Sequence, residues 1–466
     1  MLFNTYTFFI FLPIVFIIYW RFFNKNLNLQ NLFLLLSSYI FYSFWSFKFL
    51  LVLVSITVLD YFYAFAVNSK CTQKRKLFLI LSIINNFGLL AFYKYFNFFS
   101  IEFSSILHIL GYNTNPILLK VILPVGISFY TFHGMSYIFD IYNRKRLPTR
   151  NFVNYSLFVT FFPLLVAGPI ERANHLLPQI ENSRVFKYEN LIFGLRLILY
   201  GLFKKVVLAD NLSGFVDNIY ANPSAHNSTI LILASIAFSF QIYGDFSGYS
   251  DIAIGTAKIL GFELLSNFNY PYFSSNISEF WKKWHISLSS WFKDYLYFPL
   301  GGSRGTFWIN IRNIFIIFLV SGFWHGANWT FIFWGILHAT AYVAYFIYTK
   351  NCLSFIQNKI TSTLVTFSFV TFAWIFFRSI SISSAFNFIY FITHNFNIPF
   401  YIFDPAILKI ISIILVFISF DYIFKKNERE LRFNFFSNFR FFIYLILIIT
   451  ILLNMNNNSS FIYFQF

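Results

Sequence analysis

Long apolar runs recur along almost the whole chain, and they limit its possible folds more than any other feature. A helix needs roughly 20 apolar residues to cross a bilayer. Runs of about this length lie near 4–22, 30–47, 49–67, 77–96, 120–141, 191–209, 229–245, 313–325, 328–349, 361–379, 406–424 and 440–456. Shorter or interrupted runs lie near 152–170, 250–265 and 384–394. The pattern predicts an all-α, polytopic membrane protein with about 11–13 transmembrane helices.

Composition agrees with a lipid environment and argues against a nucleic-acid partner. Only 11% of the residues are charged, whereas a soluble domain has about 25%. The net charge is +17, but the Lys and Arg residues fall in short clusters between apolar runs, as the positive-inside rule expects. We therefore expect the lipid bilayer as a partner and no nucleic acid. Cys71 and Cys352 are the only cysteines; they have no metal-ligand spacing and are read as free thiols, so no metal site is predicted.

The distribution of basic loops predicts the orientation of the chain. Basic clusters lie at 70–76, 144–150 and 425–432, whereas the loops at 97–118 and 210–228 contain no Lys or Arg. The basic loops should be cytoplasmic, which places both termini outside. Met1–Trp20 carries no charge and is read as a first span rather than a removed signal peptide. We expect one membrane domain over 1–466 in the cytoplasmic (inner) membrane.

Two segments combine apolar flanks with helix-disturbing residues. Pro163 and Gly168-Pro169 predict a re-entrant or broken helix over 152–170, which survives at membrane depth only where protein or water satisfies its backbone. The segment Q-I-Y-G-D-F-S-G-Y-S-D-I-A-I-G, residues 241–255, contains Asp245 and Asp251. One interpretation is a helix break with the two Asp residues as caps. The other is a polar cavity lining. The sequence leaves both open.

An aromatic segment follows and predicts an amphipathic helix at the headgroup level. One face carries Phe280, Trp281, Trp284, Leu288, Trp291 and Tyr295 at helical spacing. The other face carries Lys282, His285, Ser289 and Lys293. Ser278 and Glu279 indicate the start of the helix, and Pro299 with Gly301-Gly302 its end. On this pattern alone, His285 could be part of a solvated polar stripe.

The stretch Asn313–Thr349 contains no Lys, Arg, Asp or Glu. As one helix it would be about 55 Å long, well beyond a bilayer core of about 30 Å. It must bend or turn back, and Gly322, Gly326 and Asn328 indicate where. His325 lies in this break and is a candidate general base, because the pKa of imidazole is near the working pH. His338, on the next helix, is read as a packing residue.

Two blocks of this region resemble the membrane-bound O-acyltransferase family. They are W-K-K-W-H-I-S-L-S from Trp281 and S-G-F-W-H-G-A-N-W from Ser321. The runs L-P-V-G-I-S-F-Y-T-F, A-G-P-I and the terminal F-I-Y-F-Q-F are similar as well. The resemblance covers nearly the whole chain. It implies a catalytic core at about 120–350, with re-entrant or interfacial helices around a central tunnel.

Within this family the chain looks most similar to the bacterial branch that O-acetylates cell-envelope polysaccharides such as alginate and peptidoglycan. The resemblance implies that His325 is catalytic and that His285 is the second functional histidine. It further implies substrate or tunnel contacts by Trp324, Asn328, Trp284, Ser289, Asp245 and Asp251. No bound cofactor is expected, and the donor would be acetyl-CoA or another acyl thioester. Lys282 and Lys283, with Lys293, would attract its phosphates, although they could equally be basic residues snorkelling at an interface.

The implied acceptor is a polysaccharide outside the cytoplasm, and the implied protein partner is an extracytoplasmic SGNH-type O-acetyltransferase. One alternative is transfer of D-alanine or another acyl group to teichoic acid, lipid or protein. A second alternative is a non-enzymatic transporter of glycan or solute, for which Asp245, Asp251 and Glu263 would be candidate residues. Inverted repeats would favour a transporter, and the sequence displays none that we detect.

Overall fold

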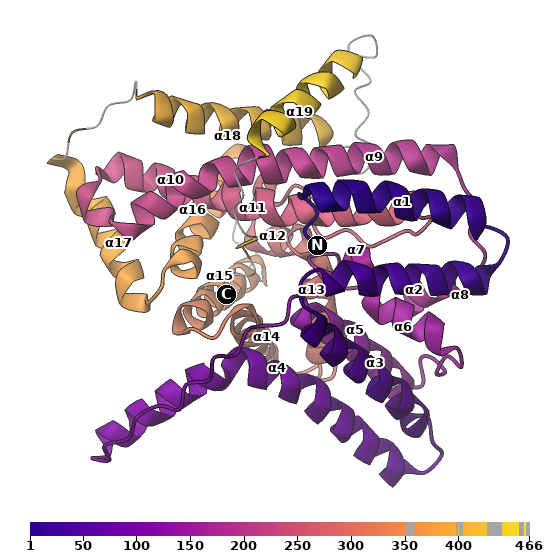
Figure 1. Cartoon of the computed structure of the whole chain (residues 1–466). Coiled ribbons are helices and arrows are strands. Elements are labelled where there is room, and N and C mark those ends of the chain that lie inside the picture. The colour runs from indigo at the N-terminus through magenta and orange to yellow at the C-terminus, as the bar shows by residue number, and fades with distance from the viewer. Residues whose placement is uncertain (351–357, 398, 400–403, 426–439, 456–460, 463–466) are drawn as a thin grey trace. The chain divides into compact units, whose positions relative to one another are not determined.

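The fold is helical throughout the part of the chain that the computed structural model describes, residues 1–350, 358–397, 399, 404–425, 440–455 and 461–462 (Figure 1). These residues contain no β-strand, which confirms the all-α prediction. They form two compact units. Unit 1 comprises Met1–Gly194 with Thr256–Leu265, and unit 2 comprises Leu195–Gly255 with Ser266–Phe466. Cys352, residues 426–432 of the last basic loop and most of the F-I-Y-F-Q-F run lie outside the described residues.

Unit 1 contains the N-terminal apolar helices. They are α1 (Tyr6–Phe22), α2 (Leu27–Ser43), α3 (Phe47–Val67), α4 (Thr72–Ile109), α5 (Ile127–Tyr142), α6 (Phe152–Thr160), α7 (Phe162–Leu165) and α8 (Ala173–Glu181). The predicted break over 152–170 is confirmed, because α6 ends before Phe161 and α7 begins one residue later. At this break the backbone N–H of Phe162 donates to the Ser38 hydroxyl of α2 at 3.1 Å. A side chain of the protein thus satisfies irregular backbone, as burial among apolar helices requires.

Unit 2 begins within α9 (Tyr188–Leu202) and carries both histidine blocks. Its further helices are η1 (Phe203–Ala209, a π-helix), α10 (Asp210–Ala221), α11 (Ser228–Ile259, whose last four residues belong to unit 1), α12 (Ile277–Lys283), α13 (Ile286–Phe292), η4 (Lys293–Tyr297, a π-helix), α14 (Phe307–His325), α15 (Trp329–Lys350), α16 (Lys359–Arg378), α17 (Ile382–His394), α18 (Pro405–Phe424) and α19 (Arg440–Asn454). Short 3₁₀ turns lie at Pro223–Ala225, Pro271–Phe273 and Asn395–Asn397.

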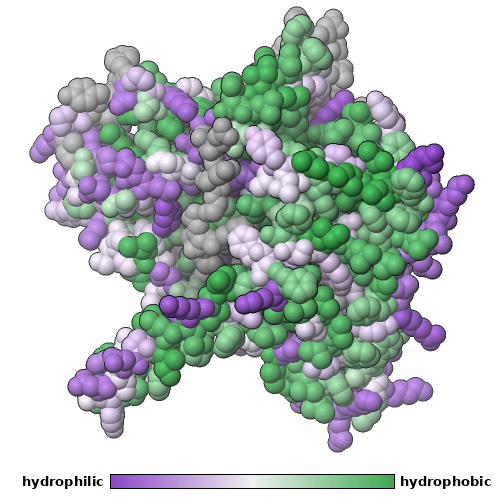
Figure 2. Space-filling model, in the orientation of Figure 1, coloured by the Kyte–Doolittle hydropathy of each residue, from purple (hydrophilic) through white to green (hydrophobic). Residues whose placement is uncertain are grey.

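Seven helices among the described residues are long and apolar enough to cross a membrane. They are α3, α4, α11, α14, α15, α16 and α18. Other predicted spans form shorter apolar helices, such as the 17-residue α1. Hydrophobic residues cover much of the face seen in Figure 2. The exposed side chains of α3 include Phe47 and Phe62. A large exposed apolar surface of this kind is typical of a membrane protein. The orientation of the termini stays a prediction.

The polar segment 241–255 does not break a helix, so that interpretation is wrong. Helix α11 runs through it without interruption. Its glycines serve close packing instead: a Cβ atom on Gly248 would lie 2.7 Å from the carbonyl oxygen of Gly201 on α9, and one on Gly201 would lie 2.6 Å from that of Gly248. Glycine at both positions lets the two backbones approach. The same residue type marks helix ends and helix contacts, so composition could not separate the two.

The aromatic segment 277–297 departs from the prediction of one amphipathic helix. It forms α12 and α13, which Trp284 and His285 separate, followed by η4. The start also differs, because Asn276 rather than Ser278 caps α12, with its side-chain oxygen accepting the N–H of Glu279 at 2.8 Å. Neither short helix could cross a bilayer. His285 therefore lies at a break and not on a continuous polar stripe.

The predicted turn within Asn313–Thr349 is confirmed, with α14 ending at His325 and α15 beginning at Trp329. The two helices pack closely along their length. A Cβ atom on Gly322 would lie 2.3 Å from the Phe331 carbonyl oxygen, and one on Gly335 would lie 2.4 Å from that of Phe318. This close antiparallel contact fixes the end of α14, and with it the position of His325.

The contact between α9 and α11 predicts the effect of an added methyl group. We expect Gly248→Ala to lower the stability of the folded chain by about 1–3 kcal/mol, because the new Cβ would overlap backbone that cannot move independently. Gly214→Ala is the matched control: nothing lies within 4 Å of its Cβ position on α10. Thermal unfolding in detergent measures both. An unchanged unfolding temperature for Gly248→Ala would contradict the close contact.

Candidate functional site

The two predicted histidines of unit 2 both lie against one indole ring, that of Trp324. The centroid of the His285 ring is 5.9 Å from that of Trp324, and the His325 ring is 4.9 Å from the same indole. His285 comes from the break between α12 and α13, and His325 from the end of α14. The structure thus brings together three of the residues that the sequence pointed to.

His285 is buried, with 1% of its surface exposed. Its backbone is left-handed, with φ 44° and ψ 54°, a conformation that few residues other than glycine adopt. Burial lowers the pKa of His285 to about 3, so its ring is neutral at physiological pH. Neither ring nitrogen has a hydrogen-bond partner among the described residues. A neutral imidazole has one N–H donor and one acceptor, and here both remain available to a bound substrate.

His325 is 3% exposed and is packed on three sides by aromatic rings. In addition to Trp324, the Trp334 ring of α15 lies 5.2 Å from it and the Phe377 ring of α16 lies 5.3 Å from it. Trp334 and Phe377 also contact each other. These rings hold the imidazole in one place and limit the water around it, which is a suitable setting for a general base.

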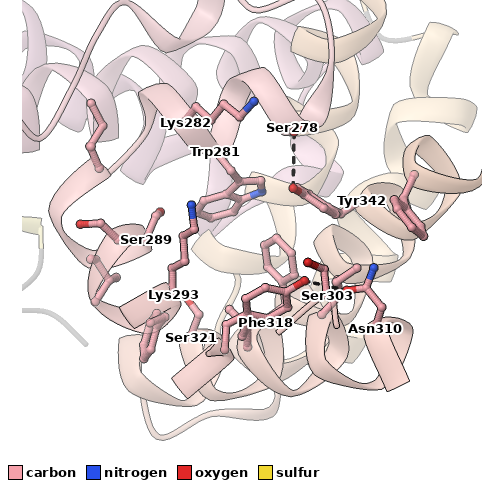
Figure 3. A pocket seen from close by; sticks show the side chains of 18 residues that line it. Ser278, Trp281, Lys282, Ser289, Lys293, Ser303, Asn310, Phe318, Ser321 and Tyr342 are labelled. Atoms are coloured by element: carbon pink, nitrogen blue, oxygen red, sulfur yellow. Dashed lines mark hydrogen bonds between the residues drawn. The ribbon is translucent and has the colours of Figure 1, made fainter. Parts of the chain in front are cut away.

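A cavity of about 510 Å³ lies between α12, α13 and η4 on one side and α14 and α15 on the other (Figure 3). Apolar side chains form much of its wall, including Trp281, Phe318 and Phe346. Lys282 and Lys293 supply two positive charges, and the Lys293 side chain extends toward Trp281. Its size and lining are those of a pocket for an organic ligand. Such a ligand would be amphipathic and anionic at one end.

Residues that line the cavity lie close in sequence to both histidines. Ile286 and Ser289 line it and flank His285 on α13, while Ser321 lines it one helical turn before His325. Between the cavity and His325 lie two aromatic residues: the Trp281 ring is 5.7 Å from that of Trp334. Trp281 also donates its indole N–H to Nδ1 of His338 at 3.3 Å. His338 is fully buried and orients a wall residue of the cavity.

Several other predicted site residues have different surroundings. Lys283 does not line the cavity; it pairs with Glu279 at 2.8 Å. Trp284 is buried in an aromatic cluster that includes Phe268 and Trp374. Asn328 binds backbone, accepting the N–H of Thr330 at 3.0 Å and donating to the Ile380 carbonyl at 2.8 Å.

The two carboxylates of α11 are ion-paired. Lys205 lies 2.7 Å from both Asp245 and Asp210, all three nearly fully buried, and Asp245 also accepts the N–H of Ile462 at 2.6 Å. Asp251 pairs with Lys204 at 2.8 Å and borders a separate cavity of about 20 Å³, which is room for about one water molecule. Paired charges of this kind stabilise the packing of α11 against η1. They lie outside the wall of the large cavity.

The sequence did not identify Trp281, Trp334 and Phe377 as parts of this site. Their aromatic character was visible, but aromatic residues make up 24% of the chain, so the type alone carried no signal. Spacing would have helped only for Trp334, which lies four residues before His338 on α15. Trp281 contacts Trp334 from another helix, and Phe377 contacts His325 from another helix. No pattern within one segment of the sequence predicts such contacts.

The sequence profile of the membrane-bound O-acyltransferase family matches residues 34–343. The chain is 39% identical over 417 residues to a peptidoglycan O-acetyltransferase of Helicobacter pylori, covering 83% of this chain and 78% of that protein. It is 37% identical over 376 residues to a probable alginate O-acetylase of Pseudomonas aeruginosa, covering 80% and 70%. It is 30% identical over 279 residues to a teichoic acid D-alanyltransferase of Bacillus subtilis, covering 54% and 68%.

The family match includes both histidines, the turn between α14 and α15, and the residues that line the cavity except Phe346. It favours an enzyme over the alternative of a non-enzymatic transporter. The helical fold with several membrane-spanning candidates agrees with it. The chain therefore belongs to the membrane-bound O-acyltransferase family.

Proposed function

We propose that this enzyme moves an acetyl group from a cytoplasmic thioester, such as acetyl-CoA, across the membrane for O-acetylation of a cell-envelope polysaccharide of the peptidoglycan or alginate type. The names of the two relatives with the broadest coverage described above support the acetyl group and the acceptor class. The single observation that carries the chemistry is the placement of two buried histidines around Trp324 beside a cavity with two lysines.

His325 acts as the general base in this proposal. It accepts the proton of the acceptor hydroxyl while the hydroxyl oxygen attacks the carbonyl carbon of the thioester. The resulting tetrahedral intermediate collapses with cleavage of the C–S bond. The departing thiolate takes the proton back from the His325 imidazolium, which leaves an ester, a thiol and the neutral histidine. The aromatic rings around His325 keep water from competing with the acceptor.

His285 stabilises the negative charge that develops on the carbonyl oxygen. Because the ring is neutral, it does this by donating a hydrogen bond from its one N–H. Burial makes that bond stronger than it would be in water, since no solvent dipoles oppose it. The two histidines thereby have different tasks, one exchanging a proton and the other holding an N–H in place.

The cavity is the site that we assign to the donor. A pantetheine arm is a narrow, amphipathic chain with phosphate at one end, and the wall of the cavity combines apolar side chains with Lys282 and Lys293. Lysine binds phosphate as a point charge. Ser321 and Ile286 mark the inner end of this cavity, nearest along the chain to the two histidines. A thioester carbonyl would then lie beside Trp281.

We also propose a location, an orientation and a partner for the enzyme. The enzyme lies in the cytoplasmic membrane with both termini outside, which follows from the basic loops at 70–76 and 144–150. An extracytoplasmic SGNH-type O-acetyltransferase would be the partner that receives the acetyl group or carries it to the polysaccharide. Transfer at a site reached from both faces avoids moving the thioester carrier through the bilayer.

The roles of the two histidines predict the activities of single variants. His325→Ala should lower ester-linked acetate on the envelope polysaccharide at least about a hundredfold, because a general base contributes on the order of 10²–10⁴ in rate. His285→Ala should lower it by roughly 10²–10³, the usual loss for one oxyanion donor. Acetate released by mild alkali from the isolated polysaccharide measures both.

His394→Ala is the control, since this histidine is exposed at the end of α17. It should leave acetylation unchanged at equal protein level. Wild-type acetylation by His325→Ala with normal expression would refute the catalytic proposal. If the polysaccharide gained D-alanine rather than acetate in a strain that expresses the chain, the acyl group would be the part of the proposal that fails.

The lysines of the cavity predict a separate effect on donor binding. Lys282→Gln and Lys293→Gln should together raise KM for acetyl-CoA about tenfold, because each removes a charged contact to phosphate. The kcat value should change less than twofold, since neither lysine takes part in the proton transfer. Lys283→Gln is the matched control on the same helix and should leave KM unchanged. An equal rise of KM in Lys283→Gln and Lys282→Gln would contradict the assignment of the cavity as the donor site.

A further inference from the structure

The backbone of His285 is held in a conformation that it would not adopt by itself. Its φ of 44° places it in the left-handed region, which costs a residue with a Cβ atom about 1–3 kcal/mol. Such a conformation persists only where neighbouring groups determine it. The position of the imidazole between Phe246 and Trp324 depends on this turn, because a change of φ at His285 would swing the ring out of that space.

One neighbouring residue makes contacts on the C-terminal side of this turn through both its backbone and its side chain. The carbonyl oxygen of Asn267 accepts the N–H of Ile286 at 2.8 Å. The Oδ1 atom of Asn267 accepts the Ser287 hydroxyl at 2.6 Å. Asn267 therefore binds the two residues that directly follow His285. The two side chains that share the second bond are buried, with Asn267 at 0% and Ser287 at 1% exposure.

The N-terminal side of the turn is tied to the same segment. The backbone N–H of Asn269 donates to the carbonyl oxygen of Lys283 at 3.0 Å. Residues 267–269 thus bind the chain before and after His285, and His285 itself is left to contact aromatic rings. The Asn267 side chain adds the one contact of this group that a substitution can remove while leaving the backbone bonds in place.

We propose that Asn267 is a positioning residue, which through its hydrogen bond to Ser287 holds the left-handed turn that aims the His285 ring at the reacting carbonyl. The inference rests on the proposed function of His285. Asn267 does not itself line the cavity, and its bond to the cavity residue Ile286 is a backbone bond that a side-chain substitution leaves in place. The effect of the substitution on the reaction therefore passes through the turn. It is a residue that the sequence motifs did not single out.

The burial of Asn267 separates this role from a purely structural one. Its Nδ2 atom is buried and has no hydrogen-bond partner among the described residues, and an unsatisfied buried donor is unfavourable for folding. Replacement by alanine would remove that unfavourable group together with the favourable bond to Ser287. The two changes oppose each other, so the stability of the variant should stay close to that of the unchanged chain. The activity of the variant should fall, because the bond that orients His285 is lost.

The test uses the full chain in detergent or vesicles with acetyl-CoA as donor. The variants are Asn267→Ala, Ser287→Ala and the double variant, each of which removes the same hydrogen bond. We expect kcat to fall about tenfold in all three, with KM for acetyl-CoA within twofold and the unfolding temperature within a few degrees. The double variant should be no worse than either single variant, because residues that act through one bond are not additive.

Ser274→Ala is the matched control: this serine is buried near the same segment, and its hydroxyl has no hydrogen-bond partner among the described residues. It should leave kcat unchanged. Multiplying losses in the double variant, or a loss confined to KM, would overturn the inference. His285→Ala separates the two proposals. If it loses activity while Asn267→Ala does not, only the positioning role fails; if His285→Ala remains fully active, the proposed role of His285 fails as well.

Discussion

Inside a bilayer, every backbone N–H and C=O that leaves a helix must find a partner within the protein, and the site of this enzyme is built at such places. The break before α7 is satisfied by Ser38, the break before α13 by Asn267, and the turn before α15 by Asn328. Two of these three places carry His285 and His325. Partners from Ser38, Asn267 and Asn328 thus satisfy the backbone where helices stop, and the stops decide where the histidines lie.

The features of the fold that depend on composition over a long stretch could be predicted from the sequence. The turn at His325 followed from the length of Asn313–Thr349 against the thickness of a bilayer, and the broken helix at 152–170 followed from Pro163. The continuity of α11 could not be predicted from its glycines. Position 248 is glycine because a Cβ there would overlap the backbone of α9, and not because the chain turns there. A glycine in the sequence indicates only that a Cβ is absent. The reason for its absence here is a contact with another helix, which the local sequence does not contain.

The sequence pointed to His285, Trp324 and His325, which lie together in the structure, but it did not predict the surroundings of the other candidate residues. Lys282 and Lys283 are equivalent in sequence, yet only Lys282 lines the cavity, because consecutive residues of a helix point about 100° apart. The break at His285 had no local signal, since the aromatic spacing of Phe280, Trp284 and Leu288 fits a continuous helix. The helix is interrupted where residues 267–269 bind the backbone on both sides of His285. Asn267 lies 18 residues before His285, so spacing within the aromatic segment carries no information about this contact.

The two histidines differ in their surroundings, and the difference fits the two tasks that we propose for them. The His285 ring contacts the rings of Phe246 and Trp324, and burial lowers its pKa, so the ring stays neutral. An imidazole with a lowered pKa is a weak base but can still donate a hydrogen bond from its N–H. His325 ends α14, one helical turn after the cavity residue Ser321. The division of tasks that we propose therefore depends on where each helix ends, and a shift of either end by one residue would exchange an imidazole for a neighbouring side chain.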